Sequence, residues 1–396
     1  MALEEAGRAP DLEAHILTSL GDVAAADWDA CVPGGNPFVR HAFLSALEES
    51  GSAVAETGWL GQHVMLKDPA GQVLGAVPMY LKSHSHGEYV FDHGWADAFE
   101  RAGGRYYPKM QVSVPFTPAT GPRLLLRGDA AADDTEAAAL RGALLSACIQ
   151  CADKTGASSL HITFPLEEEA ELMDEAGLLI RTGLQFHWDN NGYADFNTFL
   201  ADLASRKRKQ IKRERREALA AGLTVRALSG SDIEEHHWDA FFHFYQETGS
   251  RKWGMPYLTR EFFSLLGEKM GEQVVLMIAE NAGRPIAGAL NLASDDTLYG
   301  RNWGAVEYHK FLHFELCYYQ AIDYAIAHGL KRIEAGAQGE HKLVRGYLPC
   351  ATFSAHWIAN AGFRDAIEDY LQRETRQVDW EIEALGEHSP FRKGES

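Results

Sequence analysis

The chain has 396 residues, of which 46% are hydrophobic, and a formal net charge of -19 at pH 7. A chain of this length is too long for one compact core and predicts two or three domains. Its acidic balance argues against a protein that coats nucleic acid or membrane over its whole surface, so any contact with a polyanion must be local.

The first half of the chain is predicted to form a hairpin, a strand, a long loop, a helix and a strand. Two strand-like runs, 64–66 and 73–81, flank a turn that contains Pro69 and Gly71. Residues 88–92 are predicted to continue as a third strand. A loop rich in Gly, Tyr and Pro follows at 103–122, and then come a helix at 134–154 and a strand at 159–164.

A strongly basic segment at 205–221 separates the two halves. Eight of the eleven residues from Arg206 to Arg216 are Lys or Arg, in a run of strong helix formers that Gly222 is placed to end. One interpretation is a solvated, charged connector. The other is a helix that binds an anion, either a phosphate-bearing substrate, RNA or the acidic face of the protein itself. The residues assigned to this anion site are Arg206, Arg208, Lys209, Lys212 and Arg213.

The second half repeats the order of the first. Strands at 273–280 and 286–292 flank a turn; a strand at 298–303, an apolar helix at 312–327 ended by Gly329 and a strand at 331–334 follow. Short echoes lie at matching places, such as GQVLGAVPMYL against GRPIAGALNLA. We infer a tandem duplication of one mixed α/β domain, with a first copy at 11–195 and a second at 196–396. The alternative is two unrelated α/β units that both contain a hairpin.

Three further segments of the second half carry distinct patterns. A helix predicted at 233–247 bears three histidines, but no carboxylate lies at ligand spacing and we expect no metal. The glycine-rich loop 248–257 either holds an anionic group against Trp253 and Tyr257 or forms a packed corner. Apolar residues recur at helical spacing over 363–385, which predicts a docked amphipathic helix.

The repeated unit and the basic helix, together with HFELCYYQAIDYAI (313–326) and EAGAQGEHKLVRGYLP (334–349), resemble the FemAB-like branch of the GNAT acyltransferases. PKMQVSVPFTPATGPRLL (108–125) and TGSRKWGMPYLT (248–259) carry the same likeness, which covers most of the chain. The resemblance implies an α/β fold of two tandem GNAT-like mixed-sheet domains. It also implies transfer of an aminoacyl group from aminoacyl-tRNA to an amine of a peptidoglycan precursor, with no permanently bound cofactor.

One loop departs from the acetyl-CoA-dependent members of this superfamily. They carry an Arg/Gln-x-x-Gly-x-Gly/Ala loop whose backbone N–H groups cradle a pyrophosphate at the start of the crossover helix. Here that place reads AVEYHKFLH (305–313) and holds no glycine pair. The donor is therefore left open between acyl-CoA and aminoacyl-tRNA.

Acyl transfer to an amine requires a base for the amine proton, donors for the developing oxyanion and a surface that aligns the partners. The candidate bases are Glu315, Glu334 and His341. Glu315 lies near the start of an apolar helix, where it either gains a raised pKa from burial or pairs with Arg301 or Lys342 as a structural carboxylate.

The expected substrate contacts are polar residues of the loops that follow core strands, because such loops serve recognition more often than folding. They are Lys109, Arg123, Arg301, His313, Gln338, Lys342 and Arg345. We expect Lys342 and Arg345 at the rim of one cleft that gathers the three candidate bases. His313 is interpreted equally as a packed histidine or as a site residue.

No nucleophilic Ser or Cys motif is visible, so direct transfer without a covalent intermediate is expected. A catalytically silent module that holds an anionic ligand is the alternative, and the missing pyrophosphate loop supports it. The five scattered cysteines argue against a disulfide framework. With neither a signal-peptide pattern nor a span-length apolar stretch, we expect a cytoplasmic protein.

Overall fold

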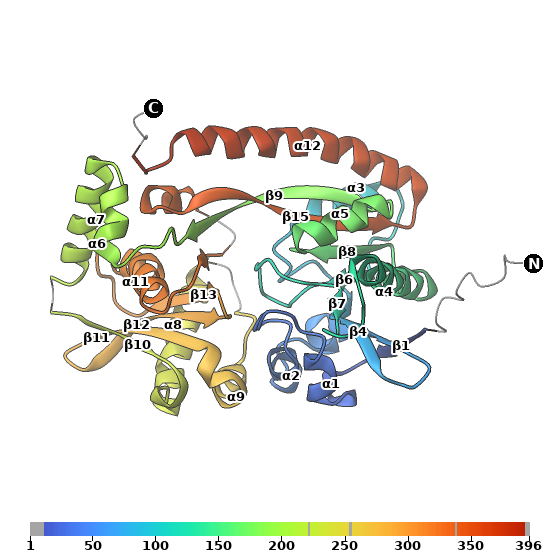
Figure 1. Ribbon diagram of the computed structural model, residues 1–396, viewed down its shortest axis with the longest axis horizontal. Coiled ribbons are helices and arrows are strands. Elements are labelled where there is room, and N and C mark those ends of the chain that lie inside the picture. Colours follow the sequence, from blue (N-terminus) through green and yellow to red (C-terminus); the bar gives the residue numbers. More distant parts are fainter. Residues whose placement is uncertain (1–11, 221, 253–255, 337–338, 393–396) are drawn as a thin grey trace, which may run out of the picture.

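The computed structural model describes residues 12–220, 222–252, 256–336 and 339–392 (Figure 1). Trp253 and Gln338, which the sequence analysis assigns to loops that contact a ligand, lie outside the described residues. Each half of the chain folds as one unit of strands and helices, and we refer to these units as the first and the second repeat.

The first repeat begins with a small sheet and ends with a long strand. Its strands are β1 (Glu13–Leu17), β2 (Trp59–Gly61), β3 (His63–Lys67), β4 (Val73–Val77), β5 (Met79–Lys82), β6 (Lys109–Val112), β7 (Leu125–Leu126), β8 (Ser159–Thr163) and β9 (Leu179–Asp189). Its helices are α1 (Ala25–Asp29), α2 (His41–Glu49), α3 (His93–Arg101), α4 (Asp134–Lys154) and α5 (Glu167–Glu175).

Two helices, α6 (Phe196–Asp202) and α7 (Ser205–Ala218), connect the repeats. The strands of the second repeat are β10 (Thr224–Leu228), β11 (Val274–Asn281), β12 (Arg284–Ala293), β13 (Thr297–Ala305), β14 (Arg332–Glu334) and β15 (Leu348–Ile358). Its helices are α8 (Glu235–Lys252), α9 (Arg260–Met270), α10 (Leu312–Phe314), the π-helical segment η5 (Glu315–Tyr319), α11 (Gln320–Ala327), the 3-10 helix η6 (Glu340–Arg345) and α12 (Ala361–Glu387).

The two repeats share one strand–helix–strand unit. In each, antiparallel strands lead through a crossover helix to a parallel neighbour: β6 and β8 are joined by α4, and β13 and β14 are joined by α10, η5 and α11. Such strand–helix–strand units place the loops that follow the strands at one sheet edge. The shared topology supports the duplication, and the predicted α/β fold class of two GNAT-like mixed-sheet units is confirmed.

The repeats exchange their last strands. Among the described residues, eleven strands form one sheet in the order β10-β11-β12-β13-β14-β9-β15-β8-β6-β5-β2, and β1-β3-β4-β7 form a second sheet. Strand β9 of the first repeat therefore lies beside β14 of the second, and β15 of the second lies beside β8 of the first. The two exchanged strands pair with each other, with Gly183 opposite Thr352 near the middle. The boundary at 195/196 stays a prediction.

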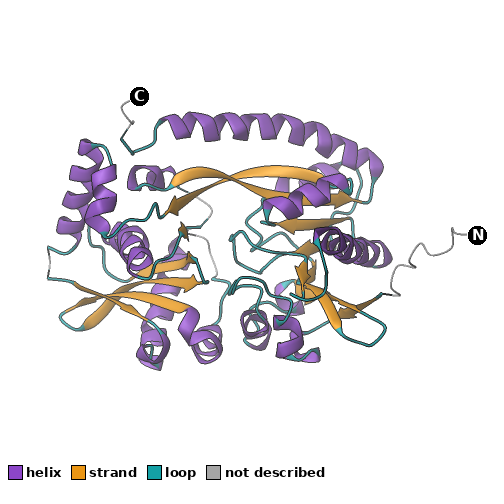
Figure 2. Ribbon diagram, in the orientation of Figure 1, coloured by secondary structure: helices purple, strands orange, loops and turns teal. Residues whose placement is uncertain are grey.

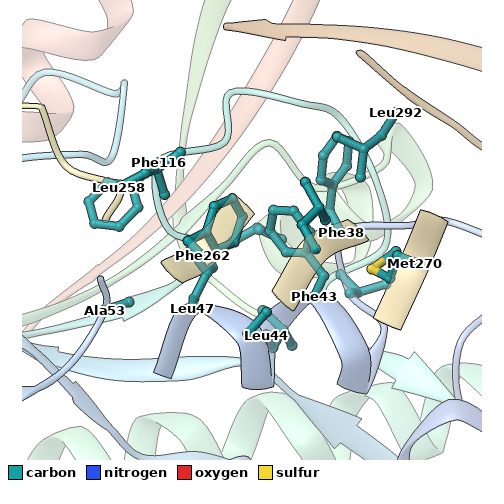
Figure 3. Close-up of a cluster of buried hydrophobic side chains, with 14 of the residues drawn as sticks. Phe38, Phe43, Leu44, Leu47, Ala53, Phe116, Leu258, Phe262, Met270 and Leu292 are labelled. Atoms are coloured by element: carbon teal, nitrogen blue, oxygen red, sulfur yellow. The ribbon is translucent and has the colours of Figure 1, made fainter. Parts of the chain in front are cut away.

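Apolar packing joins the repeats at two places. Phe43 and Leu47 of α2 share a buried cluster with Phe262 and Met270 of α9 (Figure 3). The long helix α12 lies along the exchanged pair β9 and β15 and spans both halves of the molecule (Figure 2). Burial of this kind is the main stabilising contribution between the repeats.

Several predicted elements are placed correctly and others need correction. The helix at 134–154 is confirmed by α4, and the tail helix and the basic helix by α12 and α7. The predicted third strand at 88–92 is wrong, because that segment is irregular and the strand is β6 instead. Glu88 and Asp92 are instead buried by pairing with Lys109, and Tyr89 adopts a left-handed φ of 61°.

Two further predicted elements are interrupted. The strand expected at 73–81 breaks at Pro78 into β4 and β5, which belong to different sheets, because proline cannot donate to the ladder. The helix expected at 312–327 contains η5, and π-helical turns of this kind are frequent at functional sites. The loop expected from 248 begins later, since α8 continues to Lys252.

Candidate active site

The parallel strands of the second repeat separate soon after they begin to pair. Strands β13 and β14 are in register only from Thr297 opposite Arg332 to Tyr299 opposite Glu334. On its other side β13 shifts register against β12, so that Arg301 is the extra residue of a β-bulge. A cavity of about 130 Å³ lies at this divergence.

The cavity has a backbone floor and a helical wall. Gly300 of β13 and Ala335 after β14 lie on either side of the divergence, and His313, Cys317 and Tyr318 of the interrupted helix line the wall. A Cβ at position 300 would lie 3.6 Å from Cα of Ala335, so glycine keeps this opening wide. The cavity is therefore a place where a small group can approach both strands.

Tyr318 is the hydroxyl of the cavity wall. Its oxygen lies 2.8 Å from Nε2 of His341, and burial raises the pKa of Tyr318 above its usual value. The hydroxyl therefore remains protonated at neutral pH. His341 does not line the cavity itself but contacts it through Tyr318.

Glu334 ends β14 on the opposite face of the sheet. Its neighbour Ile333 packs into the cluster around α11, and successive side chains of a strand point to opposite faces. The Glu334 carboxylate accepts the backbone N–H of Thr120 at 3.1 Å and lies 3.9 Å from Nε2 of His187. Burial raises the pKa of Glu334 to about 7, which suits a general base at neutral pH.

Glu315, the second candidate base, is held in an ion pair. Its carboxylate accepts Nη2 of Arg215 at 2.8 Å and Nε2 of Gln320 at 2.8 Å, and the residue is fully buried. The expected partners Arg301 and Lys342 are wrong, because the partner comes from the basic helix. This contact ties α7 to the π-helical segment.

The two cations expected at the rim of the cleft are buried instead. Lys342 donates from Nζ to the Gly336 carbonyl at 2.6 Å, and burial lowers the pKa of Lys342 to about 8. Arg345 donates to Oε2 of Glu214 at 2.8 Å, and its guanidinium lies 3.5 Å from the ring centroid of Phe314. They hold the loop after β14 against the helices.

Two other predicted substrate contacts belong to the core of the first repeat. Lys109 is fully buried and donates to both Glu88 and Asp92. Arg123 donates from its side chain to four backbone carbonyls, among them that of Thr163 at 2.8 Å. Both cations have partners within the first repeat, and their assignment to substrate binding stays a prediction.

Arg301 and His313, in contrast, both line the cavity. Arg301 donates to the Phe116 carbonyl and to Oγ1 of Thr117 at 3.1 Å, which fixes the bulge against a loop of the first repeat. Burial lowers the pKa of Arg301 to about 10, so it still carries its charge at neutral pH. His313 packs edge-on against Trp303, with ring centroids 5.2 Å apart.

The basic helix α7 has two different faces. Glu214 and Arg215 point inward to Arg345 and Glu315, beside the buried Ile211. The residues assigned to the anion site lie on the other face; Arg208 is half-buried, while Arg206, Lys209, Lys212 and Arg213 are exposed. An exposed row of cations on a rigid helix fits a local polyanion contact.

The segment where a pyrophosphate loop would lie is occupied by its own side-chain pairs. Glu307 accepts from Arg284 and lies 3.1 Å from Nε2 of His309, while Lys310 donates to Glu217 of α7 at 2.8 Å. Phe311 takes a left-handed φ of 66° just before α10. Lys310 thus links this segment, which leads into α10, to the basic helix.

Sequence reasoning missed three residues of this region, which are Thr120, His187 and Tyr318. His187 left a faint signal as a polar residue in the apolar run LQFHW, whereas Thr120 is positioned only by tertiary structure. Within the described ranges, no group of three His, Cys, Asp or Glu residues is placed to hold a metal ion. No helix in the same ranges is both long and apolar enough to cross a bilayer.

Comparison with known proteins gives one family and several structures. The FemAB-like family, described as peptidoglycan biosynthesis/recognition, matches residues 19–393. The crystal structure of FemX superposes with a TM-score of 0.55 at 13% identity, over 87% of this chain and 98% of FemX. The structure of L-PGS from Bacillus licheniformis gives a TM-score of 0.50 at 10% identity, over 83% and 95% of the two chains. No curated protein matches the sequence.

Proposed function

Because the chain belongs to the FemAB-like family and is an acyltransferase, we propose that it transfers an aminoacyl or acyl group to an amine where β13 and β14 diverge. The observation that carries this proposal is the pairing of an open cavity on one face of the divergence with Glu334 on the other. The donor carbonyl then lies in the cavity on one face of the sheet, and the acceptor amine approaches it from the other face, through the gap between the diverging strands.

The donor side supplies an acid and a place for the oxyanion. Tyr318 keeps its proton because burial raises its pKa, so its hydroxyl can protonate the leaving oxygen or sulfur of the donor. The bulge at Arg301 leaves backbone N–H groups outside regular pairing, and these are the donors we assign to the oxyanion. His341 orients Tyr318 from behind.

The acceptor side supplies the base. The amine nitrogen attacks the donor carbonyl, Glu334 takes the proton that the nitrogen loses, and the carrier leaves with the proton from Tyr318. One amide bond forms and one ester or thioester bond breaks, without a covalent enzyme intermediate. The N–H of Thr120 holds the Glu334 carboxylate toward the first repeat.

The donor that fits this chain better is aminoacyl-tRNA. The segment 306–311 is filled by its own ion pairs and has no pyrophosphate cradle, whereas the exposed cations of α7 lie next to it through Lys310 and Glu217. A polyanionic carrier bound along α7 would bring its acyl end toward the cavity. The family description favours an amine of a peptidoglycan precursor as acceptor.

The deciding experiment offers purified protein a charged tRNA pool and a panel of acyl-CoA thioesters, each with amine acceptors. Mass spectrometry then follows loss of the donor acyl group and gain of an amide. We expect consumption of aminoacyl-tRNA that depends on Glu334 and on acceptor. If neither donor is consumed while RNA binding to α7 persists, the protein is the anion-binding module considered as the alternative.

A further inference from the structure

A second cavity lies where the exchanged strands meet. It has a volume of about 230 Å³ and is lined by β9 and β15 around Gly183 and Thr352, and by Tyr89, Phe91 and Phe164 of the first repeat. Helix α12 closes one side through Glu374. Because the exchanged pair belongs to both repeats, this cavity exists only in the joined molecule.

The charges of this cavity compensate each other. Arg181 donates to both carboxylate oxygens of Glu374 at 2.7 Å and to the Phe91 carbonyl at 2.8 Å. A ligand with a carboxylate or phosphate would therefore have to break a bidentate ion pair to find a partner. The walls instead suit an uncharged group with apolar or aromatic surface.

Two of the aromatic walls are held in an unfavourable backbone conformation. Tyr89 has a φ of 61° and Phe164 a φ of 55°, in a region that bulky residues rarely adopt. Non-glycine residues in this region cluster at ligand clamps and active sites. Both residues line the same cavity.

Close side-chain contacts link one edge of the cavity to the proposed base. Gln185 lines the cavity, its Oε1 lies 3.2 Å from Nε2 of His187, and that nitrogen lies 3.9 Å from Glu334. Strands rise about 3.3 Å per residue, so the path from Gly183 to His187 is roughly 13 Å long and the path from Gln185 roughly 7 Å. A chain of five or six bonds covers the shorter distance.

We propose that this cavity is the acceptor site, and that it takes an uncharged aliphatic or aromatic chain whose far end is a primary amine directed at Glu334. The assignment rests on the proposed function for the identity of Glu334 as the base. The neutral cavity holds the body of the acceptor, and the Glu334 carboxylate attracts the amine end. The acceptor is thus selected by the length of its chain and by the absence of charge on the part that fills the cavity.

Binding is tested first with a defined probe, N-(5-aminopentyl)benzamide, against N-pentylbenzamide, which lacks the amine. Calorimetry on the full chain should show tighter binding of the amine by about tenfold. Gly183→Val fills the cavity, since a Cβ there already lies 3.0 Å from Oγ1 of Thr352, and should weaken both probes at least tenfold. Ala351→Val, on the exposed face of the next strand, is the matched control.

A second pair of variants guards against a folding defect at Gly183. Phe91→Ser removes an aromatic wall that is 55% exposed and should weaken the probe several-fold, whereas Trp380→Ser removes an exposed aromatic outside the cavity and should change nothing. Glu334→Gln should keep the binding of N-pentylbenzamide but abolish the preference for the amine. Equal probe affinity in wild type, Gly183→Val and Phe91→Ser, or no binding to any of them, overturns the proposal.

Turnover separates this inference from the proposed function. With the donor in hand, Gly183→Val should raise the KM for the amine acceptor about tenfold and leave kcat nearly unchanged. An unchanged KM would reject the cavity as acceptor site while transfer itself stands. If the protein consumes no donor but Gly183→Val still abolishes probe binding, the amine site stands and the transferase mechanism is rejected.

Discussion

The parallel strand pairs of the two repeats end in opposite ways. At the end of β8, Gln111 donates to Oγ1 of Thr163 at 3.1 Å and Arg123 donates to the Thr163 carbonyl at 2.8 Å, which closes the strand end. At the end of β14 the buried cation Lys342 donates to the Gly336 carbonyl at 2.6 Å, two residues beyond the strand, and a cavity lies between Gly300 and Ala335. The same topology thus provides packing in one repeat and a site in the other.

Buried polar groups elsewhere in the two repeats also differ. In the first repeat, Lys109 forms ion pairs with both Glu88 and Asp92, so these buried charges neutralise one another. In the second, Glu334 is held by a backbone N–H and keeps a carboxylate with a pKa raised to about 7. Buried carboxylates held by backbone N–H groups occur in both repeats, Glu169 in the first and Glu334 in the second, so topology alone does not decide which one acts as a base.

The largest effect on stability is expected from removing the buried cation that neutralises two carboxylates in the first repeat. Lys109→Met leaves two buried carboxylates without their cation and should lower the free energy of unfolding by about 3–5 kcal/mol. Urea titration measures this loss, and turnover per folded molecule should stay unchanged. The exposed Lys331→Met, which removes a surface pair with Asp296, should cost less than about 1 kcal/mol. Lost turnover in fully folded Lys109→Met would place a site in the first repeat.

Next in size is the loss of the proposed base. Glu334→Gln should reduce kcat by about a hundredfold or more and leave donor affinity nearly intact. The strand-end residue of the other repeat provides the control, since Thr163→Val should leave turnover unchanged. Because Glu334 acts deprotonated, kcat/KM of the wild type should rise with pH through about 7 and then level off. A pH profile without that limb contradicts the assignment.

A variant of Glu315 tests whether this buried carboxylate stabilises the fold or acts as the catalytic base. Glu315→Gln removes the charge that pairs with Arg215 and should destabilise the protein by about 2 kcal/mol, while kcat falls no more than about threefold. Thermal unfolding and turnover are measured on the same preparation. A hundredfold loss of kcat at unchanged stability would transfer the role of base from Glu334 to Glu315.

The smallest effect concerns the outer face of α7. Replacing Arg208, Lys209, Lys212 and Arg213 with Gln should flatten the dependence of RNA affinity on salt, by about 0.9 in logarithmic slope for each lost phosphate contact with a duplex. Filter binding at several salt concentrations gives the slope. Three cations of α12, Arg364, Arg373 and Arg376, changed to Gln provide the control. An unchanged slope in the α7 variant returns this helix to the role of a connector.

The sequence predicted local elements well where one pattern decided the outcome. The apolar spacing of 134–154 matches α4 to the residue, and the basic run predicted α7. It did not reveal that β9 and β15 are exchanged, because both are ordinary strands whose partners are chosen by contacts between residues far apart in the chain. Nor could it separate the two faces of α7.

The sequence indicated which types of residue could form the candidate site better than it indicated what each residue does there. In the sequence, Arg123 was predicted to bind an anion because it lies in a loop. In the structure its guanidinium donates to backbone carbonyls, which only the folded loop brings together. Lys342 and Arg345 looked exposed for the same reason. The assignment of Glu334 as a base stays a prediction, now with a stated geometry.

The exchange of β9 and β15 also sets the order in which the chain can fold. Strand β8 is covered by β15, and the paired residues His161 and His356 are 195 positions apart. While the ribosome makes the second half, the first half therefore exposes one unpaired strand edge, and β9 has no strand of its own half to join. Such an edge is prone to intermolecular pairing, so the nascent chain is vulnerable to aggregation until its last strand emerges.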